Sequence, residues 1–168
     1  LNAMEPLVTS ASIGMTKENM LLSNYPWLKW MRSFEIKAST DISGFGLLRH
    51  LLNIPLQKNQ AIGLRLEAIP YLSDAMELAK LNFAASMTAA NENSAARYIP
   101  SLNQCSIPWR IILNSPETAG PLAIVCELSK SEDILSRAHK KGFKDAAIIA
   151  SIIESQGDDH RKSPISLI

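Results

Sequence analysis

Apolar and polar residues follow two different periods along this chain, and the two periods predict helices and strands in turn. Helical spacing of apolar residues predicts helices over residues 16–22, broken at Pro26 and resumed over 27–31, then over 44–53, 73–79, 88–99 and 129–142. Alternation or short apolar runs predict strands over 5–15, 34–38, 61–67, 109–113, 122–127 and 145–154. Helices interleaved with strands are typical of a sheet covered by helices, in the α+β or α/β class.

Residues 39–52 are the most informative part of the chain. Their first five residues are mostly Ser, Thr and Asp, which are favoured N-cap residues, and an apolar helical face follows two glycines. We therefore expect a polar turn that leads into a buried helix, whose free N–H groups suit phosphate. Asp41 stands just before that helix and could hold Mg²⁺, which prefers carboxylate oxygen. Simple capping of the helix is the alternative interpretation of Asp41.

A second informative stretch is residues 115–125, which read Ser-Pro-Glu-Thr-Ala-Gly-Pro-Leu-Ala-Ile-Val. It places Thr118 and small residues between two predicted strands. The N–H groups of such a tight turn can face an anion. A turn that only connects the two strands is the alternative interpretation.

Both stretches resemble motifs of one enzyme family. Residues 40–51, Thr-Asp-Ile-Ser-Gly-Phe-Gly-Leu-Leu-Arg-His-Leu, resemble the Thr-Asp-Val-Thr-Gly-Phe-Gly-Leu-Leu-Gly-His-Leu segment of selenophosphate synthetases (selenide, water dikinases). These belong to the superfamily of aminoimidazole-ribonucleotide-synthetase-like ATP enzymes. Residues 115–125 resemble that family's Pro-Gln/Glu-Thr-Ser-Gly-Gly-Leu-Leu-Ile loop and strand. Residues 5–15 resemble, more weakly, the Lys-Pro-Leu-Gly-Thr-Gly segment that begins its C-terminal domain.

The resemblance implies a fold and a domain organisation. It covers residues 4–155, which would form the family's C-terminal domain: an α+β fold with a mixed β-sheet, helices packed on the sheet, and partial likeness to a ferredoxin-like fold. We interpret residues 1–3 as a cloning remnant ahead of Met4. Residues 156–168 are expected to form a polar tail.

The resemblance also implies a function. The intact protein would make selenophosphate from selenide and ATP, as an ATP-binding phosphotransferase of the kinase type. In this domain Asp41 would be a ligand of magnesium, while Thr40 and Thr118 would lie at the nucleotide phosphates. Mg²⁺ and ATP would be used only together with an N-terminal ATP-binding domain, which is the first expected partner. A second copy of the chain is a further candidate partner. No residue here is expected to be catalytic, so the chain alone would be inactive.

Several departures from the family pattern support a second hypothesis. Glu5 replaces a lysine, Arg49 and Pro121 replace glycines, and Ala119 replaces a serine. Pro121 has no N–H to donate, so an anion contact in that turn would be weakened. The chain could therefore be a catalytically dead binding or scaffold module of the same fold. Related ATP enzymes of purine synthesis, thiamine synthesis or hydrogenase maturation are a third option, although residues 40–48 favour the selenium branch.

Composition excludes several other classes. A formal net charge of +1 gives no broad electrostatic surface for nucleic acid. The two cysteines, Cys105 and Cys126, lack metal-binding or redox spacing, and the three histidines are scattered. No apolar run reaches the ~20 residues that a membrane helix needs. We therefore expect a cytoplasmic protein with no nucleic-acid or membrane partner.

A few single residues remain as candidates. Trp27 and Trp30 are expected to belong to the core, with a nucleobase platform or a partner interface as the alternatives. Asn91 is a candidate for a polar contact, against an ordinary helix or capping residue. His50 is expected to pack beside the first motif, and no catalytic role is expected for His139 or His160.

Overall fold

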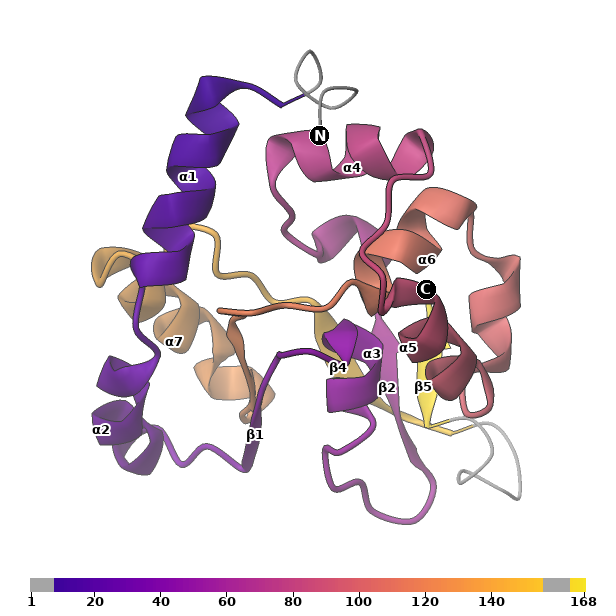
Figure 1. The fold of residues 1–168 in the computed structure, drawn as a ribbon. Coiled ribbons are helices and arrows are strands. Elements are labelled where there is room, and N and C mark those ends of the chain that lie inside the picture. Colours follow the sequence, from indigo (N-terminus) through magenta and orange to yellow (C-terminus); the bar gives the residue numbers. More distant parts are fainter. Residues whose placement is uncertain (1–7, 156–163) are drawn as a thin grey trace.

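The computed structural model describes residues 8–155 and 164–168, apart from the side chains of residues 28, 29, 31, 32 and 73. In this part of the chain, helices surround two small sheets (Figure 1). The helices are α1 (Ser10–Leu21), α2 (Tyr25–Ser33), α3 (Gly46–Leu51), α4 (Ser73–Lys80), α5 (Thr88–Ala96), α6 (Ile107–Asn114) and α7 (Leu128–Lys140), with short 3-10 helices at Leu66–Ala68 and Pro100–Gln104. The strands are β1 (Ala38–Asp41), β2 (Gln60–Leu64), β3 (Leu122–Val125), β4 (Ala150–Glu154) and β5 (Ile165–Leu167).

The larger sheet has the order β4-β2-β5 and confirms the predicted α+β class. β2 pairs antiparallel with β4 and parallel with β5, so the sheet is mixed. The main apolar core forms where α3, α5 and α6 pack near this sheet, because each presents one apolar face to it. The buried members of this core are Leu48, Leu51, Ile54, Ile62, Leu64, Ile69, Ala95, Ile99, Leu102, Leu113 and Ile165.

The C-terminal residues differ from the polar tail expected over 156–168. Residues 156–163 lie outside the described part of the chain. Ile165, however, is fully buried in the main core, and β5 pairs with β2 from Ile62 to Leu64. The correction has a simple cause, since Pro164 is followed by Ile-Ser-Leu-Ile, which can fill a free edge of the sheet.

The second sheet consists of β1 and β3 alone and joins a smaller core formed by α2 and α7. Trp27 is 6% exposed and packs there with Phe34, Ile134 and Ala138. This confirms the core interpretation of Trp27. Trp30 is half-buried and meets Trp27 edge-on, with ring centroids 5.1 Å apart.

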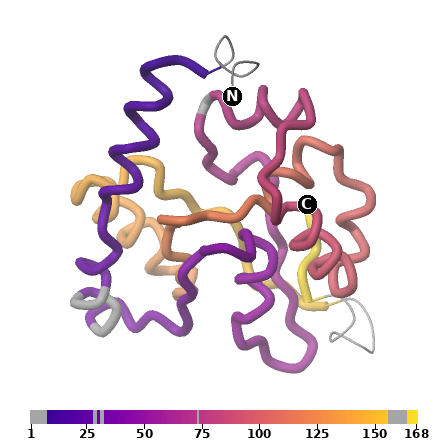
Figure 2. The backbone as a smooth tube through the Cα atoms, in the orientation of Figure 1, coloured from indigo at the N-terminus to yellow at the C-terminus, as the bar shows by residue number. Residues whose placement is uncertain are grey.

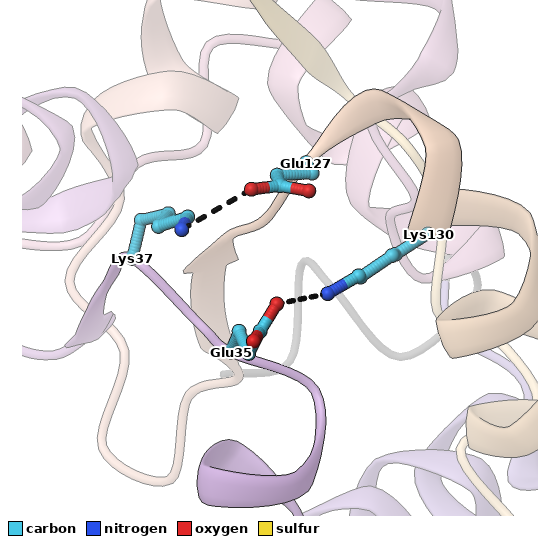
Figure 3. A network of polar contacts seen from close by, with 4 residues as sticks. All are labelled: Glu35, Lys37, Glu127 and Lys130. Carbon is cyan, nitrogen blue, oxygen red and sulfur yellow. Dashed lines mark hydrogen bonds and ion pairs between the residues drawn. The ribbon is translucent and has the colours of Figure 1, made fainter.

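Two ion pairs lie at one end of the β1–β3 ladder (Figure 3). Lys37 Nζ lies 3.2 Å from Glu127 Oε1, and Lys130 forms an ion pair with Glu35. The hydrogen bond and charge of Lys130 lower the pKa of the Glu35 carboxyl, and the same hydrogen bond raises the pKa of Lys130. These contacts connect the segment before β1 to the start of α7. Asp41 lies at the opposite end of the ladder.

Three strand predictions were wrong. Of residues 5–15, those from Ser10 onward belong to α1, which Thr9 caps by accepting a hydrogen bond from the Ser12 N–H at 3.0 Å. Residues 109–113 lie in α6, which begins with proline in its first turn, where the missing N–H costs nothing. Residues 34–37 precede β1, because Glu35 has a φ of 53° and so cannot continue a strand.

The other element predictions agree with the structure in type. The strand predicted at 61–67 overlaps β2 but ends in the 3-10 helix at Leu66–Ala68, and the strand predicted at 145–154 contains β4. Helices predicted at 73–79, 88–99 and 129–142 correspond to α4, α5 and α7. β3 falls within residues 122–127, although it is half-buried rather than fully buried. Among the described helices, none combines the length and the apolar character that a bilayer crossing requires.

Candidate functional site

The two sequence motifs lie side by side, although they are far apart in the chain (Figure 2). β1 pairs antiparallel with β3, from Ala38 opposite Val125 to Asp41 opposite Leu122. Backbone hydrogen bonds continue past the strands. The Ile42 N–H donates to the Pro121 carbonyl at 2.9 Å, and the Glu117 N–H donates to the Ser43 carbonyl at 3.2 Å. The turn after β1 and the turn before β3 therefore form one continuous surface.

Gly120 makes the close approach of these two turns possible. A Cβ atom at this position would lie 2.0 Å from the Ile42 carbonyl oxygen, well inside van der Waals contact. The Gly120 carbonyl in turn accepts a hydrogen bond from Asn24 Nδ2 at 3.2 Å. The requirement for glycine here comes from backbone packing, and Asn24 ties the turn to the start of α2.

The start of α3 differs from the predicted capped helix. Phe45 occupies the N-cap position and no side chain caps the helix. Gly46 has a φ of +75°, and a Cβ there would lie 2.8 Å from the Asn114 carbonyl carbon. α3 covers only Gly46–Leu51 of the predicted residues 44–53. Capping by Asp41, the alternative interpretation, is therefore wrong, because Asp41 is the last residue of β1.

The Asn91 side chain supports the turn before α3 by hydrogen bonds from inside the domain. The side chain is 4% exposed, and its Nδ2 donates to the Gly44 carbonyl and to the Asn114 carbonyl, both at 3.0 Å. One amide group on α5 therefore joins the turn before α3 to the end of α6. Asn91 does make a polar contact, but as a buried support of the turn and not as a surface group.

The predicted ligand residues lie on the outside of this arrangement. Asp41 and Thr118 are exposed and Thr40 is half-buried. The Thr40 hydroxyl donates to the Asp41 backbone carbonyl at 3.3 Å. No ion pair joins the Asp41 carboxylate to any described residue. The structure thus brings Asp41 and the loop of Thr118 to one surface and leaves the carboxylate open.

Glu117 adds a second carboxyl to this surface, which the sequence analysis did not single out. Glu117 is exposed on this surface, but neighbouring protein atoms partly desolvate its carboxyl and so raise the pKa of Glu117 above its ordinary value. The signal that could have indicated it is its place in the second motif, directly before Thr118. Acids with a raised pKa are enriched at functional sites, which makes Glu117 a further candidate on this surface.

The metal-binding capacity of the described residues is limited. No group of three or more His, Cys, Asp or Glu side chains gathers anywhere in residues 8–155 and 164–168. Mg²⁺ keeps several waters and is commonly held by one or two carboxylates together with phosphate oxygens. An exposed carboxylate such as Asp41 fits that role as a single ligand, with the remaining ligands supplied from elsewhere.

The described histidines and cysteines show no arrangement that would activate them for catalysis. Ser43 Oγ and His50 Nε2 are 3.0 Å apart, which places His50 beside the first motif as predicted. Burial raises the pKa of both Cys105 and Cys126, opposite to the shift that an activated thiol needs. His139 Nε2 lies 2.8 Å from the Ala146 carbonyl oxygen. His160 and Glu5 lie outside the described residues.

The sequence of this α+β domain was compared with the sequences of known protein families. Residues 21–162 match the model of the family described as AIR synthase related protein, C-terminal domain. The chain therefore belongs to this family, as the resemblance of residues 40–51 and 115–125 implied.

Curated relatives extend the comparison. A selenide, water dikinase of Paraburkholderia xenovorans is 27% identical over 134 residues, which are 80% of this chain and 38% of the relative. Those of Rhizobium meliloti (29% identity, 70% of this chain, 34% of the relative) and Campylobacter jejuni (28%, 84% and 40%) are similar. The chain thus spans about two fifths or less of the length of these curated relatives.

Proposed function

We propose that this chain is the C-terminal domain of a selenophosphate-synthetase-like enzyme that uses ATP and selenide, and that it forms one wall of a Mg²⁺–nucleotide cleft. An N-terminal ATP-binding domain would form the other wall, so the chain by itself would be inactive. In this proposal Asp41 is a ligand of the metal, and Thr40 and Thr118 lie beside the nucleotide phosphates. The selenide, water dikinases among the relatives support this assignment.

One observation carries the proposal: the two motifs that resemble the enzyme family pack against each other and expose Asp41. The exchange of backbone hydrogen bonds between Ile42 and Pro121, and between Glu117 and Ser43, gives the surface a defined shape. Asn91 and Gly120 support that shape from within. A surface that is ordered by buried contacts and carries a free carboxylate is well suited to position a metal.

A bound Mg²⁺ would neutralise charge on the phosphates during phosphoryl transfer. Asp41 would orient the ion through a carboxylate oxygen, and Thr40 would stabilise the local backbone through its bond to the Asp41 carbonyl. Glu117 would add negative charge to the same surface once its proton is lost. Phosphoryl transfer needs several positioned charges acting together, and the described residues offer too few of them alone.

The second candidate is a catalytically dead binding or scaffold module. Pro121 removes one N–H donor from the turn, and Arg49 is placed with its guanidinium 5.9 Å from the Tyr98 ring centroid. Arg49 thus has a structural partner within the domain, which accounts for a large side chain at that position without any catalytic role. A second copy of the chain could be the partner of such a module.

The test combines this chain with a separately produced N-terminal domain of a selenide, water dikinase and measures selenide-dependent AMP and phosphate formation. D41A and D41N should lower that activity by at least about tenfold, since several kcal/mol of charge stabilisation depend on the metal. D145N, at an exposed aspartate far along the chain, is the matched control. Full activity in D41N would show that Asp41 is not a metal ligand in the cleft. Nucleotide binding without turnover in the wild-type pair would favour the scaffold module.

A further inference from the structure

We propose that a shallow pocket between α2 and α7 binds a small phosphate-bearing anion. The pocket has a volume of about 210 Å³. Its lining residues are Trp30, Ser33, Phe34, Arg137, Lys140 and Lys141. It is formed by elements that carry none of Thr40, Asp41 and Thr118, so this inference does not rest on the proposed function.

Three cations gather at this pocket, and two of them remain uncompensated. Arg137 Nε lies 3.1 Å from an Asp133 carboxylate oxygen, one helical turn earlier on α7. No carboxylate of the described residues forms an ion pair with Lys140 or Lys141. Both lysines line the pocket, so an anion bound there would face two positive charges that no described carboxylate neutralises.

The end of α7 is arranged so that it does not repel such an anion strongly. The last carbonyls of a helix carry partial negative charge, but those of Arg137, Ala138 and His139 already accept hydrogen bonds here. Gly142, with a φ of +96°, turns the chain back. The Lys141, Gly142 and Phe143 N–H groups then donate to the carbonyls of Arg137, His139 and Ala138 at 3.1–3.2 Å. These carbonyls therefore have hydrogen-bond partners at the end of the helix, while three positively charged side chains line the pocket.

The aromatic rings of the pocket hold the cations in place. The Arg137 guanidinium lies 5.1 Å from the Phe34 ring centroid, and the Lys141 ammonium lies 5.7 Å from that of Trp30. Trp30 in turn meets Trp27 edge-on. Since these cations occupy the ring faces, a planar base has no described ring left to stack on. The ligand is therefore recognised through its phosphate, and the volume admits only a small group attached to it.

The test titrates the whole chain with inorganic phosphate, glycerol phosphate and AMP, by calorimetry and by tryptophan fluorescence. We expect saturable millimolar binding that weakens with added salt. Inorganic phosphate and glycerol phosphate should bind with similar affinity, and AMP should bind no more tightly than they do, because the pocket offers no surface for a base. The double variant K140A/K141A should bind at least about tenfold more weakly. K17A/K58A, which removes two exposed lysines elsewhere, should bind as the wild type does.

Three results would overturn the proposal. One is the absence of saturable binding by any of the three probes at low salt. Another is binding that K140A/K141A leaves unchanged while circular dichroism shows the variant folded. A preference of tenfold or more for AMP over glycerol phosphate would also contradict it, because that result requires a base-binding surface that the pocket lacks.

Discussion

If Asn91 is a buried support of the turn before α3, its replacement by alanine should lower the free energy of unfolding. In N91A, the Asn114 carbonyl loses its donor in a fully buried place and the Gly44 carbonyl loses its donor in a part-buried one. A buried carbonyl left without a partner costs about 1–3 kcal/mol, and a bond that water can partly replace contributes about 0.5–1.5 kcal/mol. The free energy of unfolding should therefore fall by about 3 kcal/mol.

Urea denaturation followed by circular dichroism measures this change. For a domain of this size, a loss of ~3 kcal/mol corresponds to a fall in melting temperature of roughly 10 °C. N93A is the matched control, because Asn93 is exposed on the same helix and should change the stability by less than about 0.5 kcal/mol. N91D should be less stable than N91A at neutral pH, since a carboxylate would face two carbonyl oxygens.

A loss in N91A no greater than that in N93A would refute the reasoning. It would mean that Asn91 does not join the turn before α3 to the end of α6 in solution. Hydrogen exchange gives an independent measurement at the same place. In N91A the amide of Gly46, which donates to the Ser43 carbonyl at 3.0 Å, should exchange faster because the turn opens more often.

Two further predictions concern the second turn. G120A should lower the stability by about 3 kcal/mol or more in thermal unfolding, because the new Cβ would meet the Ile42 backbone. G14A, where nothing lies within 4 Å of the added atom, should instead raise it by about 0.5–1 kcal/mol; equal effects of the two would contradict the packing argument. Desolvation raises the pKa of Glu117, so the unfolded chain loses this proton first and stability falls as pH rises from 4.5 through the raised pKa. E117Q should therefore melt as the wild type does below pH 4.5 and at a higher temperature at pH 7, and a pH-independent difference would argue against it.

Residues with a strong local signal were predicted correctly from the sequence. α4, α5 and α7 are helices of eight or more residues, although no side chain caps any of them, and β2 has an alternating pattern beside a proline-marked loop. The apolar run at 109–113 is too short to show a helical or an alternating period. Such a run fits a strand or a buried helix equally well, and Pro108 at the start of α6 decided for the helix.

The motifs at residues 40–51 and 115–125 could be recognised in the sequence, since both are local and long. Their meeting was not, because pairing between β1 and β3 depends on contacts between distant parts of the chain. Only the tertiary structure shows that Asp41 is the exposed last residue of a strand and does not cap a helix. It also shows the hydrogen bond from Asn91 to the turn before α3 and the pairing of β5 with β2. Local periodicity therefore determined most helices, whereas the site was decided by long-range backbone pairing and close packing, which no short window of sequence contains.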